Sequence, residues 1–527
     1  MKPTMLITGM ALALMAMGCT KGRYSGASNA KYYVTTKMLD GMEATKTATD
    51  SVVMNTEEYD HIVENDFKDA ATAPLSTFSI DVDNASYTNV RRIINSGYLP
   101  EKGAVRIEEF VNYFEYDYPQ PKGSDPFSIT TEVWDAPWKQ GHQLLRIGIQ
   151  GKSPDYENLK PSNLVFLLDT SGSMDSPQKL PLLRDAFMMM VDNLSPNSRV
   201  SIVTYAGSAG LVLPSTSVDN KEAITEALSK LKAGGATAGG QGIELAYKTA
   251  SENYIKDGNN RVILATDGDF NVGVSSRSGL MELIENNKGN DIFLTICGFG
   301  MGNYKDGAME EISNWGDGNY FYIDSMKEAQ KVFGKELMAN LFVIAKYVKV
   351  QVEFNPAKVQ AYRLIGYENR VMNNEDFNDD LKDAGELGAG HRVTALYEVV
   401  PVGVPFEGPK ADKLKYQEVA QVTGASQDLL TVKLRYKPLQ SDTSLLIEKS
   451  VATQSIPWQQ AAPDSKFVTA VAGFGMQLRD SKYKGTLDYD MILALAQQGT
   501  DGTDEYKAEF IDLVKKAKGI KPDVAGK

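Results

Sequence analysis

A run of large apolar residues that stops at an aspartate is the feature that most constrains this chain. Residues 164–168 read Leu-Val-Phe-Leu-Leu, Asp169 follows, and Ser171 and Ser173 come next at alternate positions. Such a run is typical of a strand buried on both faces of a parallel sheet. Residues after such a strand lie at the carboxyl edge of the sheet, where open α/β sheets bind ligands. One carboxylate and two hydroxyls there suit Mg²⁺, Mn²⁺ or Ca²⁺ better than zinc or copper.

Strand and helix patterns alternate around this run, from about residue 160 to 342. This alternation predicts a mostly parallel sheet with helices on both faces. The strand expected at 261–266 also ends in a carboxylate, and the glycine-rich stretch 234–240 between the two strands carries one threonine. If the two strands flank the switch point of the sheet, their polar groups converge on one crevice. The predicted constellation is Asp169, Ser171, Ser173, Thr237 and Asp267.

Three motifs resemble the von Willebrand factor type A (VWA) domain with its metal-ion-dependent adhesion site: Asp-Thr-Ser-Gly-Ser-Met at 169–174, Gly-Gly-Ala-Thr-Ala-Gly-Gly at 234–240 and Ala-Thr-Asp-Gly-Asp at 265–269. The resemblance implies a doubly wound sheet, with hydroxyl ligands from Ser171, Ser173 and Thr237. Asp169 and Asp267 would act directly or through water. The resident ion would be Mg²⁺ or Mn²⁺ rather than Ca²⁺, and its incomplete shell would leave a position for a carboxylate of a protein partner. Capping of a turn would explain Asp169 alone, but not all five positions.

Strand-like alternation flanks the α/β region on both sides, at 127–134 and 143–150 before it and at 348–354, 361–365, 391–400 and 429–436 after it. Because the ends of a domain usually lie close together, one domain can be inserted in another. We therefore expect one β-sandwich, built from residues before 155 and after 343, with the VWA domain inserted; two separate β units are the alternative. Residues 466–520 read as helices that pack back onto the sandwich. The stretches 76–87, 97–118, 364–370 and 388–398 also resemble a YfbK-like group of bacterial lipoproteins. This resemblance implies no particular biochemical activity.

The N-terminus has the pattern of a processing signal. Lys2 precedes an apolar stretch at 5–17, which is too short to span a bilayer, and Gly18-Cys19 follows. Residues 16–19 resemble a bacterial lipobox, which implies that Cys19 is lipidated; an ordinary signal peptide is the alternative. A lipid-anchored protein of the cell envelope is expected, and Thr20 after the cysteine favours the outer membrane. Multiple acyl chains anchor a protein stably.

The expected divisions are a lipoprotein signal peptide at 1–19, a flexible tether at 20–75, sandwich strands at 76–155, the VWA domain at 156–342, a β-rich domain at 343–462 and a helical region at 463–527. A net charge of −13 disfavours nucleic acid as a partner. The histidines, His61, His142 and His391, form no sequence pair, and no catalytic pairing can be assigned.

The expected function is a membrane-anchored, metal-dependent interaction module that binds an acidic group of a protein partner, and not an enzyme. An envelope enzyme or enzyme accessory factor and a purely structural envelope lipoprotein are the alternatives. Asp81 and Asp83 stand at alternate positions and would share one face of a strand, as a second metal or acid–base pair or as a solvated or hydrogen-bonding pair.

Overall fold

The computed structural model describes residues 56–80, 82–154, 159–235, 239–268, 277–288, 290–408, 426–441, 443–452 and 454–521. They belong to one compact unit that begins at Val53. Cys19 and the part of the expected tether at 20–55 lie outside the described residues, as do Asp81 and Thr237.

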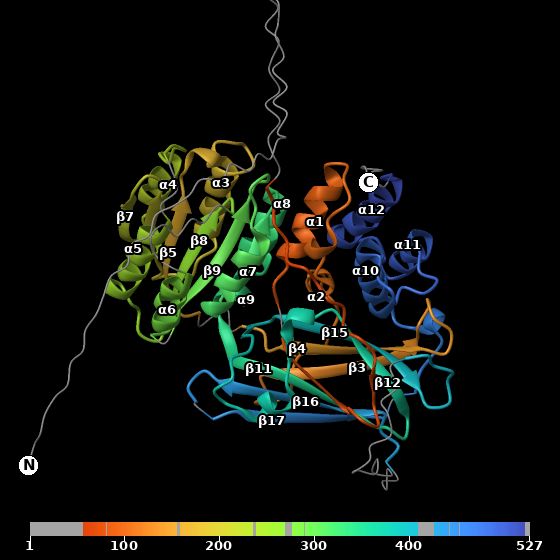
Figure 1. Cartoon of the computed structure of the whole chain (residues 1–527). Helices are drawn as coiled ribbons and strands as arrows, with labels where there is room; N and C mark the ends of the chain where they lie inside the picture. The colour runs from red at the N-terminus through yellow and green to blue at the C-terminus, as the bar shows by residue number, and fades with distance from the viewer. Residues whose placement is uncertain are drawn as a thin grey trace, which may run out of the picture. The chain divides into compact units, whose positions relative to one another are not determined.

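The α/β region is built on a six-stranded sheet (Figure 1). Its strands run in the order β10 (Tyr320–Ile323), β9 (Ile292–Phe299), β8 (Asn259–Thr266), β5 (Ser162–Asp169), β6 (Arg199–Tyr205) and β7 (Ala209–Ser217). Five strands are parallel, and β7 pairs antiparallel with β6 at the edge. After β7 the chain returns to the other side of β5, so the strand order reverses between β5 and β8. This is the switch point that the sequence predicts.

Helices cover both faces of this sheet, because successive side chains of a strand point to opposite faces. Leu164, Phe166 and Leu168 of β5 share one core with α3 (Leu180–Asp192), α4 (Lys221–Ser229), α8 (Met326–Gln330), the π-helical turn η3 (Lys331–Lys335) and α9 (Leu337–Leu341). Val165 and Leu167 share the other core with α5 (Gly239–Glu252), α6 (Arg277–Lys288) and α7 (Asp306–Trp315). The predicted doubly wound α/β fold is confirmed. Cys297 of β9 is a buried free thiol.

Two antiparallel sheets form the expected β-sandwich. One contains β1 (Lys68–Asp69), β12 (Val359–Ile365), β15 (Arg392–Pro401), β4 (Gln143–Gly151) and β3 (Phe127–Asp135). The other contains β13 (Val371–Met372), β2 (Leu75–Ser79), β11 (Val343–Phe354), β16 (Leu430–Pro438) and β17 (Leu445–Val451), and β14 (Leu387–Gly388) also pairs with β11. Pairing of β4 with β15 and of β2 with β11 joins segments from before and after the α/β region in each sheet. The α/β region is therefore inserted in one sandwich.

Helices from both ends of the described chain share one core beside the sandwich (Figure 1). The C-terminal α10 (Pro463–Arg479), α11 (Tyr489–Gln498) and α12 (Glu505–Gly519) share a core with α1 (Ala85–Asn95) and α2 (Ile107–Asn112), and with Trp134 and Leu144 of the sandwich. The C-terminal helices were expected; α1 and α2 were not, because residues 76–155 were predicted to supply strands. Helix α2 is short, and α1 buries polar Asn89 and Arg91 beside its apolar residues, which obscures a helical apolar stripe.

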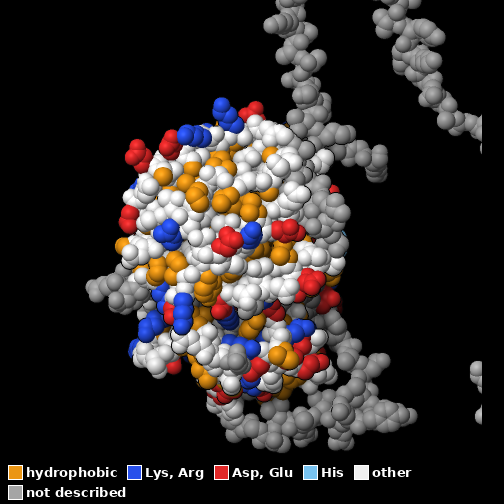
Figure 2. All heavy atoms as spheres, turned by 90° about the vertical axis from the view of Figure 1, so that its left-hand side faces the viewer, with side chains coloured by type: hydrophobic (Ala, Val, Ile, Leu, Met, Phe, Trp, Pro, Cys, Tyr) orange, Lys and Arg blue, Asp and Glu red, His pale blue; other side chains and the backbone are white. Residues whose placement is uncertain are grey.

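Short helical turns complete the described chain: η1 (Lys102–Ala104), η2 (Gly172–Met174), η4 (Glu368–Arg370), η5 (Asn374–Asn378) and η6 (Trp458–Gln460). Each helix within the described ranges is too short or too polar to cross a membrane. Figure 2 faces the side of the molecule where β7, α4 and α5 lie, and it shows hydrophobic side chains between charged groups of both signs. Leu211 and Val212 of the edge strand β7 are exposed.

The flexible tether predicted for residues 20–75 is wrong for its described part. Residues 56–60, called the strap below, pair with the loop 300–305 between β9 and α7, and the Thr56 N–H lies 2.8 Å from the Gly302 carbonyl oxygen. Further along, Phe67 and Ala70 are buried. These residues are fixed by backbone hydrogen bonds and a few anchoring side chains rather than by a periodic apolar pattern, so sequence reasoning missed them.

Candidate metal centre at the carboxyl edge of the VWA sheet

Two carboxylates meet at the switch point. Asp169 is the last residue of β5, and Asp267 directly follows β8, the parallel neighbour of β5. Both side chains are fully buried. A buried carboxylate needs partners that compensate for its lost hydration. The structure supplies them, and they differ between the two residues.

Asp169 is held by the turn that follows it. Its Oδ1 accepts a hydrogen bond of 2.8 Å from the Ser171 N–H, and its Oδ2 accepts one of 3.2 Å from the Thr266 hydroxyl. The hydroxyls of Ser171 and Ser173 lie 2.9 Å apart. Burial raises the pKa of Asp169 to about 6 and the charge of Asp267 adds to the rise, whereas the hydrogen bonds from Ser171 and Thr266 oppose it. The structure therefore gathers Asp169, Ser171 and Ser173 as the sequence predicts.

The glycine-rich stretch lies beside this turn. The Gly234 N–H donates to the Thr170 carbonyl over 2.8 Å, and the Gly172 N–H donates to the Gly235 carbonyl over 3.1 Å. These two hydrogen bonds hold the start of the glycine-rich stretch against the serine turn. Thr237 itself is outside the described residues.

Two residues that sequence reasoning missed complete the centre. The Lys179 ammonium, at the start of α3, donates to Asp267 Oδ2 over 2.8 Å. The Asn303 amide, in loop 300–305, donates to Asp267 Oδ1 over 3.1 Å, and its oxygen accepts from the Lys179 ammonium over 3.3 Å. Lys179 stands 88 residues from Asp267 in the sequence. Only the fold brings the two together.

The donor set fits a hard divalent cation. Asp169, Ser171 and Ser173 offer only oxygen atoms, and Asp267 adds a further carboxylate beside them. Oxygen ligands of this kind are what Mg²⁺ and Mn²⁺ prefer. Among the described residues, Asp169 and Asp267 bring carboxylates to this edge of the sheet, and Ser171 and Ser173 bring hydroxyls. One oxygen of Asp267 also accepts a hydrogen bond from the Lys179 ammonium, so the surroundings of Asp267 differ from those of Asp169.

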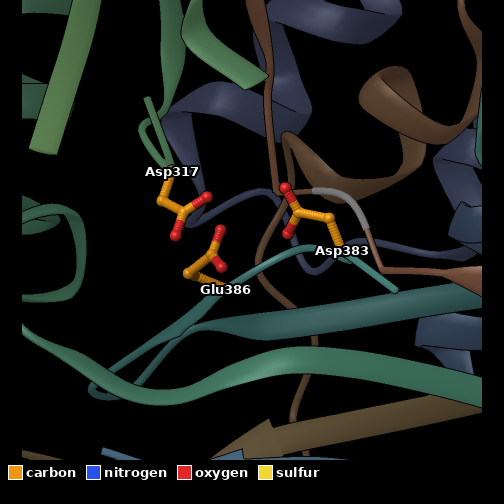
Figure 3. A group of neighbouring side chains, drawn as sticks. All are labelled: Asp317, Asp383 and Glu386. Atoms are coloured by element: carbon orange, nitrogen blue, oxygen red, sulfur yellow. The ribbon is translucent and has the colours of Figure 1, made fainter. Parts of the chain in front are cut away.

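A second acidic cluster lies at the boundary between the VWA domain and the sandwich. Asp317 of the α7–β10 loop faces Asp383 and Glu386 of the segment before β14, and their ligand atoms lie within 4.8 Å of one another (Figure 3). The Lys288 ammonium bonds to Asp317 and lies 2.7 Å from Asp383. This lysine already supplies a cation, so the cluster is an ion-pair network that bridges two parts of the fold.

Asp83 and His142 have structural partners. Asp83 precedes α1 instead of lying on a strand, so the predicted shared strand face is wrong for Asp83; its Oδ1 accepts from the Tyr320 N–H over 2.8 Å. His142 Nδ1 lies 2.6 Å from Glu398, a buried contact that no sequence pattern indicated.

Comparisons with known proteins agree with this architecture. Family models match as von Willebrand factor type A domain at residues 163–335, as von Willebrand factor at 53–146 and as Uncharacterized protein YfbK, C-terminal, at 339–520. Uncharacterized protein YfbK of Escherichia coli (strain K12) is 41% identical over 479 residues, which cover 88% of this chain and 82% of that protein. Inter-alpha-trypsin inhibitor heavy chain H4 of Homo sapiens is 28% identical over 157 residues, 28% of this chain and 17% of that protein.

Among solved structures, von Willebrand factor type A from Catenulispora acidiphila aligns with a TM-score of 0.42 and 14% identity, over 74% of this chain and 89% of that chain. The extent of the match to the E. coli protein settles the family. The chain belongs to the YfbK family of VWA-domain proteins. VWA domains are generally protein-interaction modules and are often metal-dependent, and the VWA proteins and YfbK relatives that this chain resembles are not known enzymes.

Proposed function

We propose that this protein is a lipid-anchored interaction module of the bacterial cell envelope that binds an acidic group of a protein partner through a divalent cation. The observation that carries the proposal is the pair of hydroxyls, Ser171 and Ser173, 2.9 Å apart beside the buried carboxylate of Asp169. Together with Thr237 and Asp267 they would hold Mg²⁺ or Mn²⁺. The bound ion would supply a positive centre that attracts a carboxylate.

The anchor is proposed from the sequence. Acylation of Cys19 would attach the chain to a bilayer, in the outer membrane by preference, and residues 20–55 would link it to the strap. The strap pairs with loop 300–305, and Asn303 of this loop bonds to Asp267. The chain from the anchor would therefore reach the folded part next to the metal centre.

Calorimetric titration of Mg²⁺ tests the metal assignment. We expect heat of binding and a rise in melting temperature with the wild-type protein, and neither with Asp169→Ala, because the buried carboxylate beside the serines is lost. Asp192→Ala is the matched control: this aspartate lies at the end of α3, with its side chain 65% exposed in a surface pair with Lys221. Equal responses of wild type and Asp169→Ala would overturn the metal centre.

Capture from membranes tests the interaction. Wild-type protein should retain partner proteins in Mg²⁺ buffer and lose them in EDTA, and Asp169→Ala should retain none in either buffer. Retention that is unchanged by EDTA and by the substitution would contradict metal-dependent binding. It would favour a purely structural role for the centre.

A further inference from the structure

Lys179 places a fixed positive charge inside the metal centre. Its side chain is only 9% exposed, and its ammonium contacts the fully buried Asp267 and the amide oxygen of Asn303. The stem of the lysine runs against the Gly300 backbone, where an added Cβ would lie 2.3 Å from the lysine Cε. Because Gly300 has no side chain, the stem of Lys179 can lie against its backbone and reach Asp267.

The lysine changes the charge balance of the centre. Asp169 and Asp267 contribute two negative charges, and the hydroxyls and Asn303 contribute none. A divalent ion would neutralise the two carboxylates by itself. Summed over these described side chains and Lys179, the charge is −1 without an ion and +1 with one. A net positive charge beside these two fully buried carboxylates is unfavourable unless an anion accompanies it.

We propose that Lys179 makes the binding of the metal ion and of an anionic partner group cooperative. It opposes the ion when the ion binds alone, and it attracts one negative charge once the ion is bound. The centre therefore selects a singly charged anionic group, such as a side-chain carboxylate, over neutral oxygen ligands. This inference rests on the proposed function and adds to it a residue that determines ligand charge.

Calorimetry on the full chain with Lys179→Met tests the proposal, with acetate as the anionic probe. Methionine keeps the unbranched apolar stem, one heavy atom shorter than lysine, and removes the charge. We expect Mg²⁺ alone to bind Lys179→Met about tenfold more tightly than wild type, or better, since the repulsion between two cations is removed. Acetate should tighten Mg²⁺ binding to wild type and have a much smaller effect on Lys179→Met.

Lys331→Met is the matched control, because it removes another buried lysine of the same domain, which pairs with Glu336 away from the centre. It should bind Mg²⁺ as wild type does. If Lys179→Met does not fold without the ion, Lys179→Gln gives the same comparison, since its amide can still donate to Asp267 without carrying a charge.

The outcomes separate the inference from the proposed function. Absence of Mg²⁺ binding to wild type would contradict the proposed function, and binding to Lys179→Met alone would show that the lysine replaces the ion. Mg²⁺ binding to wild type with equal affinity for Lys179→Met, or with no effect of acetate, would overturn the inference alone. Cooperative binding in wild type that is lost with Lys179→Met supports it.

Discussion

Gly268 follows Asp267 of the candidate metal centre, and its backbone conformation is one that other residues avoid. Its φ is +106°, and an added Cβ would lie 2.7 Å from the Tyr304 Cα and 2.9 Å from the Lys305 nitrogen. Both obstacles are backbone atoms of the loop that carries Asn303, so they cannot move as a side-chain end would. The glycine allows that loop to approach Asp267 closely enough for the Asn303 hydrogen bond.

Gly268→Ala is expected to lower the free energy of unfolding by about 2–4 kcal/mol, because the alanine would be strained at this φ and would push the loop away. Urea unfolding measures the change. Gly207→Ala, in the same domain with no atom within 4 Å of the added Cβ, should change stability by less than ~0.5 kcal/mol. Equal unfolding midpoints for the two variants would contradict the proposed role of Gly268.

The sequence predicted which residues lie together where they are close in the chain, and it did not where they are far apart. Asp169, Ser171 and Ser173 lie within five residues, and the strand before them fixes where they sit. Lys179 and Asn303 were missed because neither belongs to a motif and each meets Asp267 only through the packing of α3 and loop 300–305. The position of Thr237 stays a prediction.

The strap, residues 56–60, is an ordered element that the sequence pattern did not predict. Its Glu57 side chain is 6% exposed and binds the Arg92 guanidinium over 2.9 Å, the Gly302 N–H over 2.9 Å and the Tyr59 hydroxyl over 2.8 Å. Burial works to raise the pKa of Glu57, but the Arg92 charge and these hydrogen bonds outweigh it and lower the pKa. Glu57 thereby links the strap to α1 and to the loop that carries Asn303.

Glu57→Ala should destabilise the protein by about 3 kcal/mol, because Arg92 loses a buried charge partner and the Gly302 N–H loses its acceptor. Glu58→Ala is the matched control next to it: that side chain is 76% exposed in a pair with Lys305, so the expected loss is below ~1 kcal/mol. Urea unfolding at neutral pH compares the two. Similar losses for both glutamates would mean that the strap contributes little through Glu57.

Helices and strands with a clear periodic pattern of apolar residues were predicted from the sequence, and those without such a pattern were not. Strands β3, β4, β15 and β16 and the three C-terminal helices follow their apolar patterns closely. Helix α1 was not predicted, because it buries Arg91. The Arg91 guanidinium contacts Asp324, Glu328 and Glu509. A long-range partner of this kind cannot be read from the local pattern.

At the scale of the whole molecule, the VWA domain and the rest of the described chain keep separate apolar cores. The two VWA cores contain residues of the inserted domain, with Ala85 as the exception, and the large cores of the sandwich and of the helices contain none of them. Charged contacts join the parts instead. Arg91 bridges α1, the VWA domain and α12; Arg106 contacts Asp306; and Lys288 bridges Asp317 and Asp383. The insertion itself was predictable, but these polar junctions were not.

Lys288, Asp317, Asp383 and Glu386 form a junction between the VWA domain and the sandwich, called the Lys288 junction below. It should make the stability of the protein depend on pH. Burial raises the pKa of Glu386 well above its ordinary value of 4.5, and the charges of Asp317 and Asp383 add to the rise. Burial likewise raises the pKa of Asp317 to about 6, although Lys288 opposes it. A carboxyl group whose pKa is raised by folding stabilises the folded state below its unfolded pKa, and this contribution is lost as the pH rises through the folded value. The junction is therefore weaker at pH 7 than at about pH 4.5.

Glu386→Gln removes the penalty for ionising this half-buried group beside two other carboxylates. The variant should be more stable than wild type at pH 7 by about 1 kcal/mol or more, and the advantage should shrink to nothing as the pH falls to about 4.5. Urea unfolding at a series of pH values measures the difference. Glu353→Gln on β11, where the side chain is 50% exposed, should show no such trend. A Glu386→Gln advantage that stays constant with pH would mean that folding does not raise the pKa of Glu386, and the pH dependence of this junction would then have to come from other groups.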